Sequence, residues 1–140
     1  MALPTKLLLE IVTPDRALVR EEVDELQVPG AEGYLGVLPG HTPLLATLKV
    51  GELWFRIGQD THHLAIAGGF VEVLPDGVTV LAQIAERAHD IDVARAEAAR
   101  KRAEERLARP SAEFDFERAR VALLKSLIRL QVASRARTRV

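Results

Sequence analysis

The sequence predicts an α+β protein, with an N-terminal antiparallel β-sandwich over residues 1–88 and a C-terminal antiparallel α-helical hairpin over residues 89–140. Short β-rich runs fill the first segment, separated by turn formers every 8–12 residues or so. From residue 90 the apolar residues recur at helical spacing. The charge balance also changes sign: residues 1–88 hold 6 Lys and Arg against 12 Asp and Glu, and residues 89–140 hold 13 against 8. Opposite net charges of −6 and +5 suggest two domains with different partners.

The first domain contains five runs rich in β-formers, which we expect to be strands. They are residues 23–28, 53–57, 64–67, 70–74 and 78–82. Turn signals separate these runs, among them Pro29-Gly30 and Gly68-Gly69. The residues after Gly58 are expected to form the return strand of a hairpin. Since the strand pattern is complete by Ala85, this domain is expected to fold without the hairpin.

The second domain is expected to begin with Asp90 as a helix N-cap and Asp92 as a favourable negative charge in the first turn. One helix face then carries Val93, Ala96, Ala99, Ala103 and Leu107. Proline at position 110 interrupts the helix. A second helix carries Phe116, Ala119, Leu123, Leu127 and Leu130 on one face. Because alanine buries little area, the hairpin is expected to be a mobile element beside a stable sandwich.

Composition narrows the class of protein. The chain has no cysteine, so a disulfide framework and thiolate metal sites are ruled out. No apolar run approaches the roughly 18 residues of a membrane span, and no signal-peptide pattern opens the chain, so a soluble intracellular protein is expected. No phosphate loop or nucleophile elbow is present, and the adjacent His62 and His63 point to opposite faces of a strand. We expect neither catalytic residues nor a metal site.

The most informative segment is residues 33–46, Gly-Tyr-Leu-Gly-Val-Leu-Pro-Gly-His-Thr-Pro-Leu-Leu-Ala. Its glycines and prolines force sharp turns. The segment holds no nucleophile or carboxylate, so its expected role is structural and not catalytic. Together with Val-Thr-Pro-Asp at 12–15, Ala-Gly-Gly-Phe-Val-Glu-Val at 67–73, Thr-Val-Leu-Ala at 79–82 and Asp-Ile-Asp at 90–92, it resembles the epsilon subunit of bacterial rotary F-type ATP synthases.

The resemblance implies a non-catalytic central-stalk (rotor) subunit that couples proton flow to ATP synthesis and inhibits ATP hydrolysis through its hairpin. The implied partners are the gamma subunit, the c-subunit ring, and the beta (and alpha) subunits. The implied location is the cytoplasmic face of the cell membrane, with membrane association only through the complex. The loop containing Gly30, Glu32 and Tyr34 is expected to meet the c-ring, and His41 the gamma subunit. Alternatively, His41 is a turn histidine that bonds the local backbone.

No cofactor is required by this resemblance, but a regulatory ATP is implied. Ile91, Asp92, Arg95 and Ala96 are similar to a motif through which some bacterial epsilon subunits bind ATP. The remaining candidates for that site are Glu86, Lys125 and Arg129. Lysine at 125 supplies a point charge in place of the bidentate fork of arginine. The alternative is that Asp92 is an ordinary helix-start charge with Arg95 as its ion-pair partner.

The second helix is basic, and the resemblance implies that this helix meets an acidic segment of the beta subunit and blocks rotation in the hydrolysis direction. The residues expected to make this contact are Arg118, Arg120, Lys125, Arg129 and Arg135. The rival hypothesis is an adaptor whose basic hairpin docks on an acidic protein or a nucleic acid. We expect no nucleic acid, because the hairpin offers few aromatic side chains for base stacking.

Overall fold

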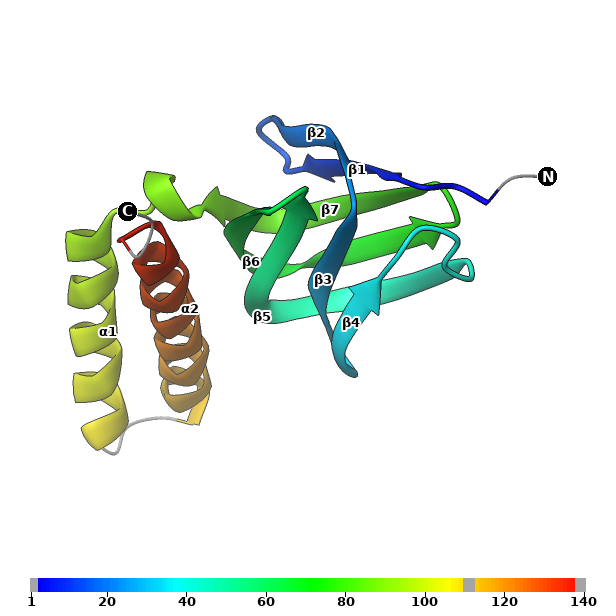
Figure 1. Cartoon of the computed structure of the whole chain (residues 1–140). Coiled ribbons are helices and arrows are strands. Elements are labelled where there is room, and N and C mark those ends of the chain that lie inside the picture. The colour runs from blue at the N-terminus through cyan, green and yellow to red at the C-terminus, as the bar shows by residue number, and fades with distance from the viewer. Residues whose placement is uncertain (1–2, 110–112, 138–140) are drawn as a thin grey trace. The chain divides into compact units, whose positions relative to one another are not determined.

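A computed structural model of the chain describes residues 3–109 and 113–137, with the backbone alone at 113–115 and 137. The chain divides into two compact units, Met1–Glu86 and Arg87–Val140. Unit 1 is built of strands, and unit 2 contains a 3₁₀ turn and two helices (Figure 1). The predicted fold class, a β-sandwich followed by a helical hairpin, is confirmed.

Seven strands form one hydrogen-bonded sheet in the order β2-β1-β7-β6-β5-β3-β4. Their bounds are β1 Leu7–Val12, β2 Ala17–Val23, β3 Glu25–Gly30, β4 Gly33–Val37, β5 Leu44–Ile57, β6 Asp60–Leu74 and β7 Gly77–Arg87. The pairings β1–β2, β3–β4, β3–β5 and β5–β6 are antiparallel. β1 and β7 pair in parallel, so the sandwich is not antiparallel throughout. The N-terminal strand thus lies beside the last strand of its own unit.

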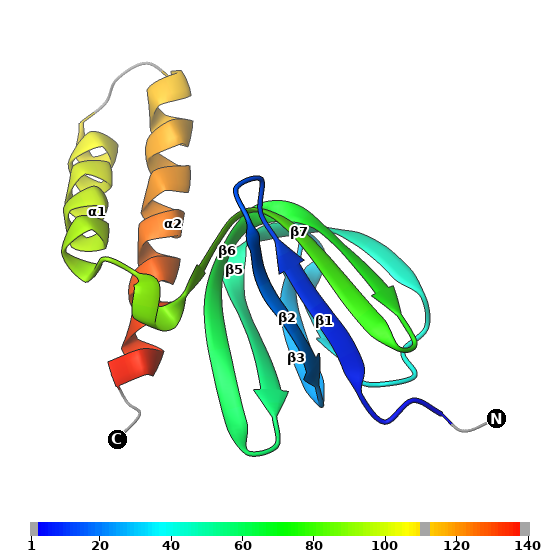
Figure 2. The same ribbon diagram turned by 90° about the horizontal axis from the view of Figure 1, so that it is seen from above.

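The sheet curls around its core until β2 contacts β5, although three strands separate them in the sheet order (Figures 1 and 2). The alternation of β1 shows how the core is filled: Leu7, Leu9 and Ile11 are fully buried, and the residues between them are half-buried. Phe55 is the largest fully buried side chain. One continuous apolar core therefore supports this unit.

β5 and β7 extend well beyond the expected runs 53–57 and 78–82, and β6 joins the expected runs 64–67 and 70–74 into one strand. β6 runs continuously through Gly68 and Gly69, where the sequence predicts a turn between two strands. Both glycines have positive φ, 80° and 125°, inside the strand. Because glycine serves bulges as well as turns, the dipeptide bends β6 without ending it. β1, β2 and β4 are not among the expected strands. Three consecutive leucines and a charged segment carry little β signal, and the two glycines of Gly33–Val37 indicate turns.

Unit 2 begins with a 3₁₀ turn, η1 Ala88–Asp90, followed by α1 Val93–Ala108 and α2 Glu113–Arg137. The N-cap of α1 is Asp92, not Asp90 as expected. The Asp92 carboxylate accepts the Arg95 backbone N–H at 3.0 Å, and Asp90 ends η1 instead. In the described part of the chain, no helix has the length and hydropathy to cross a membrane.

The two helices pack through a seam of small residues, called the small-residue seam below. Its members recur every seven residues and are at most 5% exposed: Ala96 and Ala103 in α1, and Ala119, Ser126 and Ala133 in α2. The α1 face was predicted correctly. The α2 face was predicted only in part: Ala119 is buried as expected, but Phe116 and Leu127 are 53% and 44% exposed. Close approach to an alanine-rich helix selects small side chains over large ones. Ser126 fits because its hydroxyl donates to its own helix, 3.0 Å from the carbonyl oxygen of Ala122.

Candidate functional site

The β3–β4 hairpin carries three of the expected rotor-interface residues. Gly30 pairs with Gly33 across a two-residue loop, and a Cβ on Gly30 would lie 2.8 Å from the Gly33 carbonyl oxygen. Glu32 is exposed in that loop. Tyr34 is 47% exposed, and the Lys49 ammonium lies 5.3 Å from the centre of its ring. The hairpin therefore presents a carboxylate and an aromatic ring to the surroundings.

Close to its loop, this hairpin is bonded to Glu52 of β5, a residue with a buried carboxylate that sequence reasoning missed. The Glu52 backbone N–H donates to the Tyr34 hydroxyl at 3.3 Å. The Glu52 carboxylate is buried and lies 2.7 Å from Nδ1 of His63 on β6. A single carboxylate between the apolar neighbours Val50 and Leu53 of β5 is the signal that could have identified it. These contacts link β4, β5 and β6.

His41 lies in the turn between β4 and β5 and bonds the local backbone. Its Nδ1–H donates to the Thr42 carbonyl oxygen at 2.6 Å, and its backbone N–H donates to Leu38 at 3.1 Å. The preceding Gly40 N–H donates to the Pro75 carbonyl at 2.7 Å. This is the geometry of the turn-histidine alternative. A contact of His41 with a partner subunit stays a prediction.

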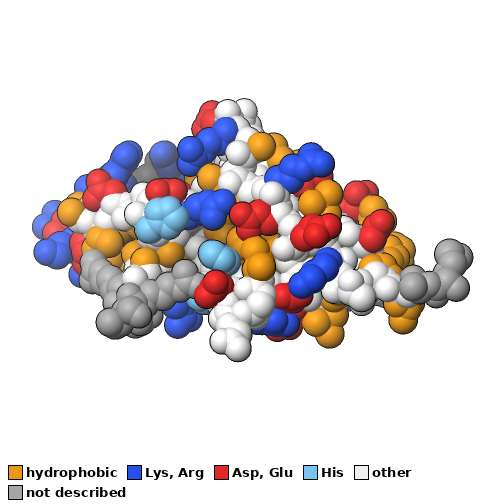
Figure 3. Space-filling model, turned by 45° about the horizontal axis from the view of Figure 1, so that its top comes forward, with side chains coloured by type: hydrophobic (Ala, Val, Ile, Leu, Met, Phe, Trp, Pro, Cys, Tyr) orange, Lys and Arg blue, Asp and Glu red, His pale blue; other side chains and the backbone are white. Residues whose placement is uncertain are grey.

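A row of exposed apolar side chains crosses the outer face of the sheet; it is called the apolar row below. Leu45, Phe70 and Leu81 are 70%, 52% and 54% exposed. Phe70 pairs with Thr47, two residues beyond Leu45 on β5, so the two apolar side chains share a face. Leu81 pairs with the half-buried Val12 of β1. Apolar side chains also reach the surface between charged ones in Figure 3.

Sequence reasoning missed the apolar row. Its signal is an apolar residue at an outward strand position: Phe70 stands next to the buried Val71, and Leu81 stands between the buried Val80 and Ala82. Large apolar residues grouped on one exposed face commonly mark an interaction site. The row is therefore a candidate docking surface of unit 1.

The candidate nucleotide residues are spread over three elements. Glu86 lies near the end of β7, and Ile91 is buried between η1 and α1. Asp92 is the N-cap of α1, Arg95 is exposed, and Ala96 is fully buried in the small-residue seam. Ala96 therefore packs the helices together. Lys125 and Arg129 are half-buried on α2. Within the described residues, no ion pair joins the Asp92 and Arg95 side chains. The Asp92 carboxylate instead accepts a hydrogen bond from the Arg95 backbone N–H.

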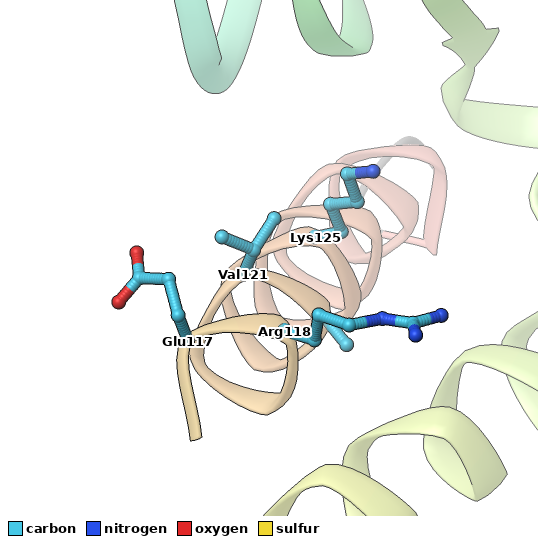
Figure 4. A pocket seen from close by; sticks show the side chains of 5 residues that line it. Glu117, Arg118, Val121 and Lys125 are labelled. Carbon is cyan, nitrogen blue, oxygen red and sulfur yellow. The ribbon is translucent and has the colours of Figure 1, made fainter. Parts of the chain in front are cut away.

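One open pocket of about 330 Å³ lies along α2 and brings two of the predicted cations together. Its lining residues are Glu117, Arg118, Val121, Ala122 and Lys125. Figure 4 shows the Glu117 carboxylate and the Arg118 guanidinium pointing away from each other. Neither Asp92 nor Arg95 lines this pocket. The pocket therefore belongs to the basic helix and does not gather the predicted nucleotide set.

The basic residues of α2 are not electrostatically equivalent. The Arg120 guanidinium lies 2.6 Å from a Glu117 carboxylate oxygen, a bond that raises the pKa of Arg120 and lowers the pKa of Glu117. Arg118 is exposed, and Arg129 and Arg135 each have an interaction partner. Arg118 therefore presents a more available charge than Arg120.

Two family models match the chain in sequence order. The beta-sandwich domain of the ATP synthase delta/epsilon chain matches residues 6–88, and the long alpha-helix domain of the same chain matches residues 89–134. The ATP synthase epsilon chain of Syntrophobacter fumaroxidans is 54% identical over 93% of this chain and 97% of its own length. The epsilon chain of Solibacter usitatus is 47% identical over 95% of this chain and 99% of its own length.

Solved structures agree with these matches. A chain of the Euglena gracilis mitochondrial ATP synthase (OSCP/F1/c-ring) has a TM-score of 0.83 at 25% identity, over 96% of this chain and 84% of that one. A chain of the Tetrahymena thermophila mitochondrial ATP synthase (central stalk/c-ring) has a TM-score of 0.62 at 13% identity, which shows a shared fold. Its coverage is 98% of this chain and 100% of that one. With both domains matched in order and bacterial relatives about half identical over nearly their whole length, the chain belongs to the epsilon-chain family of bacterial ATP synthases.

Proposed function

We propose that this chain is a non-catalytic central-stalk subunit of a proton-translocating ATP synthase, which couples proton flow to synthesis and restrains ATP hydrolysis through its hairpin. The observation that carries the proposal is the similarity to epsilon chains over both units, sandwich and hairpin alike. The proposed location is the cytoplasmic face of the cell membrane, with which the chain associates only as part of the ATP synthase complex. No cofactor is required for this mechanical role.

The apolar row supports a fixed attachment of the sandwich to the gamma subunit. Burying a large apolar side chain stabilises an interface by about 1.5–3 kcal/mol, and the row offers three: Leu45, Phe70 and Leu81. A rotor subunit must transmit force without deforming, and a sandwich with one continuous core has the required rigidity. The β3–β4 hairpin, with Glu32 exposed in its loop, is the proposed contact with the c-ring.

The hairpin supports a regulatory role because little apolar area holds it together. Alanine and serine make up the small-residue seam, so packing between the helices contributes far less than a leucine seam would. We propose that α2 leaves this packing and places its basic residues against acidic segments of the beta (and alpha) subunits. Arg118 and Lys125, which line one pocket, would lead this contact.

A regulatory ATP is the second part of the proposal. Asp92 uses Oδ1 to cap α1 and, within the described residues, keeps Oδ2 without a hydrogen bond. Arg95 is exposed on the same turn, so both groups can meet a ligand at the start of α1. Lys125 and Arg129 would contribute from α2. A nucleotide that contacts both helices would favour the folded hairpin.

The attachment is tested by reconstitution of the whole ATP synthase with charge inserted in the apolar row. A Phe70→Glu/Leu81→Glu chain should keep a folded sandwich, since both side chains already face solvent, but should fail to co-purify with gamma. Gln59→Glu, in the exposed β5–β6 turn, is the matched control and should assemble normally. Normal assembly of the double variant, with coupled ATP synthesis, would contradict this docking surface.

A further inference from the structure

Oppositely charged side chains border the apolar row on its two sides. Phe70 and Glu72 are exposed on β6 with a buried residue between them, so both lie on the outer face. Thr47 and Lys49 are exposed on β5 in the same way. Because Thr47 pairs with Phe70, Glu72 lies on one side of this pair and Lys49 on the other. At about 3.4 Å per residue, their Cα atoms are about 14 Å apart, beyond the screening length of about 8 Å, so the two charges act separately.

Neither charge is neutralised within the described residues. Glu72 forms no ion pair there. The Lys49 ammonium lies 5.3 Å from the centre of the Tyr34 ring, a contact that favours the cation without cancelling its charge. Glu10 of β1 shows the contrast, because the Arg20 guanidinium lies 3.7 Å from its carboxylate. Glu72 and Lys49 therefore present uncompensated charges of opposite sign beside the row.

A carboxamide stands on the same side of the row as Lys49. Gln83 is exposed on β7, two residues beyond Leu81, with a buried residue between them. Its side chain lies over Gly68, since a Cβ added to that glycine would be 2.7 Å from Oε1 and 3.3 Å from Cδ of Gln83. The register of β5 and β6 places Lys49 opposite the same glycine. Within the described residues the carboxamide makes no hydrogen bond, so its N–H groups and its oxygen can both bind a partner.

This arrangement selects both the chemistry and the direction of a docked segment. Apolar contacts such as those of Phe70 stabilise an interface in either direction, whereas charges of opposite sign at the two sides do not. A segment docked the wrong way round would place its own cation against Lys49 and its own anion against Glu72. The carboxamide of Gln83 matches the donor and acceptor of a peptide group.

We propose that Glu72, Lys49 and Gln83 fix the orientation in which a partner segment docks on the apolar row. The segment carries apolar side chains at its centre, a cation facing Glu72, and a carboxylate or carbonyl oxygen facing Lys49 and Gln83. The proposal rests on the proposed attachment of the row to the gamma subunit and adds that this attachment has a single direction. Because the charged groups are exposed, their part of the binding should weaken with added salt.

The first test reverses the two charges and keeps the net charge. ATP synthase depleted of this chain is titrated with the full-length wild type or with Glu72→Lys/Lys49→Glu. The exchange should weaken binding at least about tenfold, because like charges then face each other on both sides of the row. Glu72→Gln and Lys49→Gln should each weaken it about two- to fivefold. Gln59→Lys and Gln59→Glu make the same two changes in net charge in the exposed β5–β6 turn, and these controls should bind like the wild type.

The second test replaces the carboxamide by an apolar side chain of similar length. Gln83→Met enlarges the apolar row, yet it should bind about threefold more weakly or worse, as expected for the loss of a hydrogen bond. Thermal melts should match the wild type for all variants, because the changed side chains are exposed.

Wild-type affinity in Glu72→Lys/Lys49→Glu or in Gln83→Met, or equal losses in the Gln59 controls, would overturn the proposal. Its failure can be told apart from failure of the attachment itself. Normal assembly of Phe70→Glu/Leu81→Glu would show that the row is not the docking surface. If that variant fails to assemble while the charge exchange binds like the wild type, the attachment stands and only its fixed orientation is wrong.

Discussion

A Cβ atom on Gly69 would lie 2.1 Å from the carbonyl oxygen of Leu81 on the neighbouring strand β7. Gly69 also has a φ of +125°, which side chains of L-residues rarely allow. Backbone approach and backbone conformation therefore both require glycine here. The close contact lies beneath the apolar row, because Phe70 follows Gly69 and Leu81 is itself a member of the row.

Gly69→Ala should destabilise the protein by more than about 2 kcal/mol, because it combines an unfavourable φ with a clash against main-chain atoms that cannot rotate away. Gly36→Ala is the matched control: Gly36 lies in β4, and a Cβ added there would meet nothing within 4 Å. That control should change the free energy of unfolding by less than about 1 kcal/mol. Urea denaturation of the two variants checks both values, and similar stabilities would contradict the steric argument.

Much of the fold was predictable because its signals are local. Strand-rich and helix-rich halves differ in apolar period, and Pro and Gly punctuate the first half. The turn expected at Gly68 and Gly69 is wrong because the residues that permit a turn also permit a bulge. Asp90 and Asp92 are both good N-caps, and the sequence does not choose between them.

The candidate surfaces were less predictable because they depend on non-local pairing. The apolar row exists only because β5, β6 and β7 are neighbours, and Leu45 and Leu81 are distant in the sequence. Most of the buried face of α2, apart from Ala119, was missed for a different reason. Apolar side chains occur around most of that helix, so hydrophobicity alone does not mark the buried face. Close packing against α1 favours small side chains, and Ser126 is therefore buried while Leu127 is exposed.

An ion cluster at one edge of the sandwich predicts acid sensitivity. The pKa of Asp24 is lowered mainly by a hydrogen bond from the Lys6 side chain and next by one from the Gly58 backbone N–H, at 2.6 Å. The Arg56 guanidinium lies 3.6 Å from the same carboxylate. A carboxyl pKa lowered by folding adds stability that is complete above the unfolded value of about 3.9 and lost as pH falls through the folded value. Asp24→Asn should therefore be less stable than the wild type at pH 7, with the difference shrinking below about pH 4.

Thermal melts of both proteins between pH 2.5 and 7 measure this difference. Asp15→Asn, in the exposed turn before β2, is the control and should follow the wild type throughout. A difference between Asp24→Asn and the wild type that stays constant across this range would show that the lost carboxylate stabilises the fold by something other than its charge.

Truncation after Ala88 should separate the two roles of the chain. All seven strands end by Arg87, and the core lies within unit 1, so the fragment should fold. It should still assemble with gamma and support ATP synthesis, while ATP hydrolysis by the complex rises because the hairpin is gone. Failure to assemble would assign the hairpin a structural part in attachment.

Neutralising the basic helix should weaken inhibition of ATP hydrolysis. Arg118→Ala should have a larger effect than Arg120→Ala, because Glu117 already pairs with Arg120. Inhibition by the wild type should also weaken with added salt, which screens exposed charges over about 8 Å at physiological ionic strength. Hydrolysis assays of reconstituted complexes measure both effects. Unchanged inhibition after all five replacements, at Arg118, Arg120, Lys125, Arg129 and Arg135, would indicate steric blocking by the apolar side chains of α2.

ATP is expected to act as a signal that holds the hairpin folded. A ligand that contacts α1 and α2 at once binds only the folded hairpin, and at 100 times its Kd it shifts the balance by about 2.7 kcal/mol. That inverts a modest preference, although a complete switch from 1:99 to 99:1 needs about 5.5 kcal/mol. A high ATP concentration would then keep α2 packed against α1 in the folded hairpin, and a falling ATP concentration would allow α2 to leave it and inhibit hydrolysis.

Calorimetry of the isolated chain with ATP decides whether this signal exists. Arg95→Ala and Arg129→Ala should each weaken binding, whereas Lys101→Ala should not. Asp92→Asn is the sharpest variant, because asparagine caps a helix as well as aspartate does and removes only the negative charge. Weaker ATP binding at unchanged helix content would assign the Asp92 carboxylate to the ligand. Binding that ignores these changes, or no binding at millimolar ATP, would leave Asp92 as the cap of α1 alone.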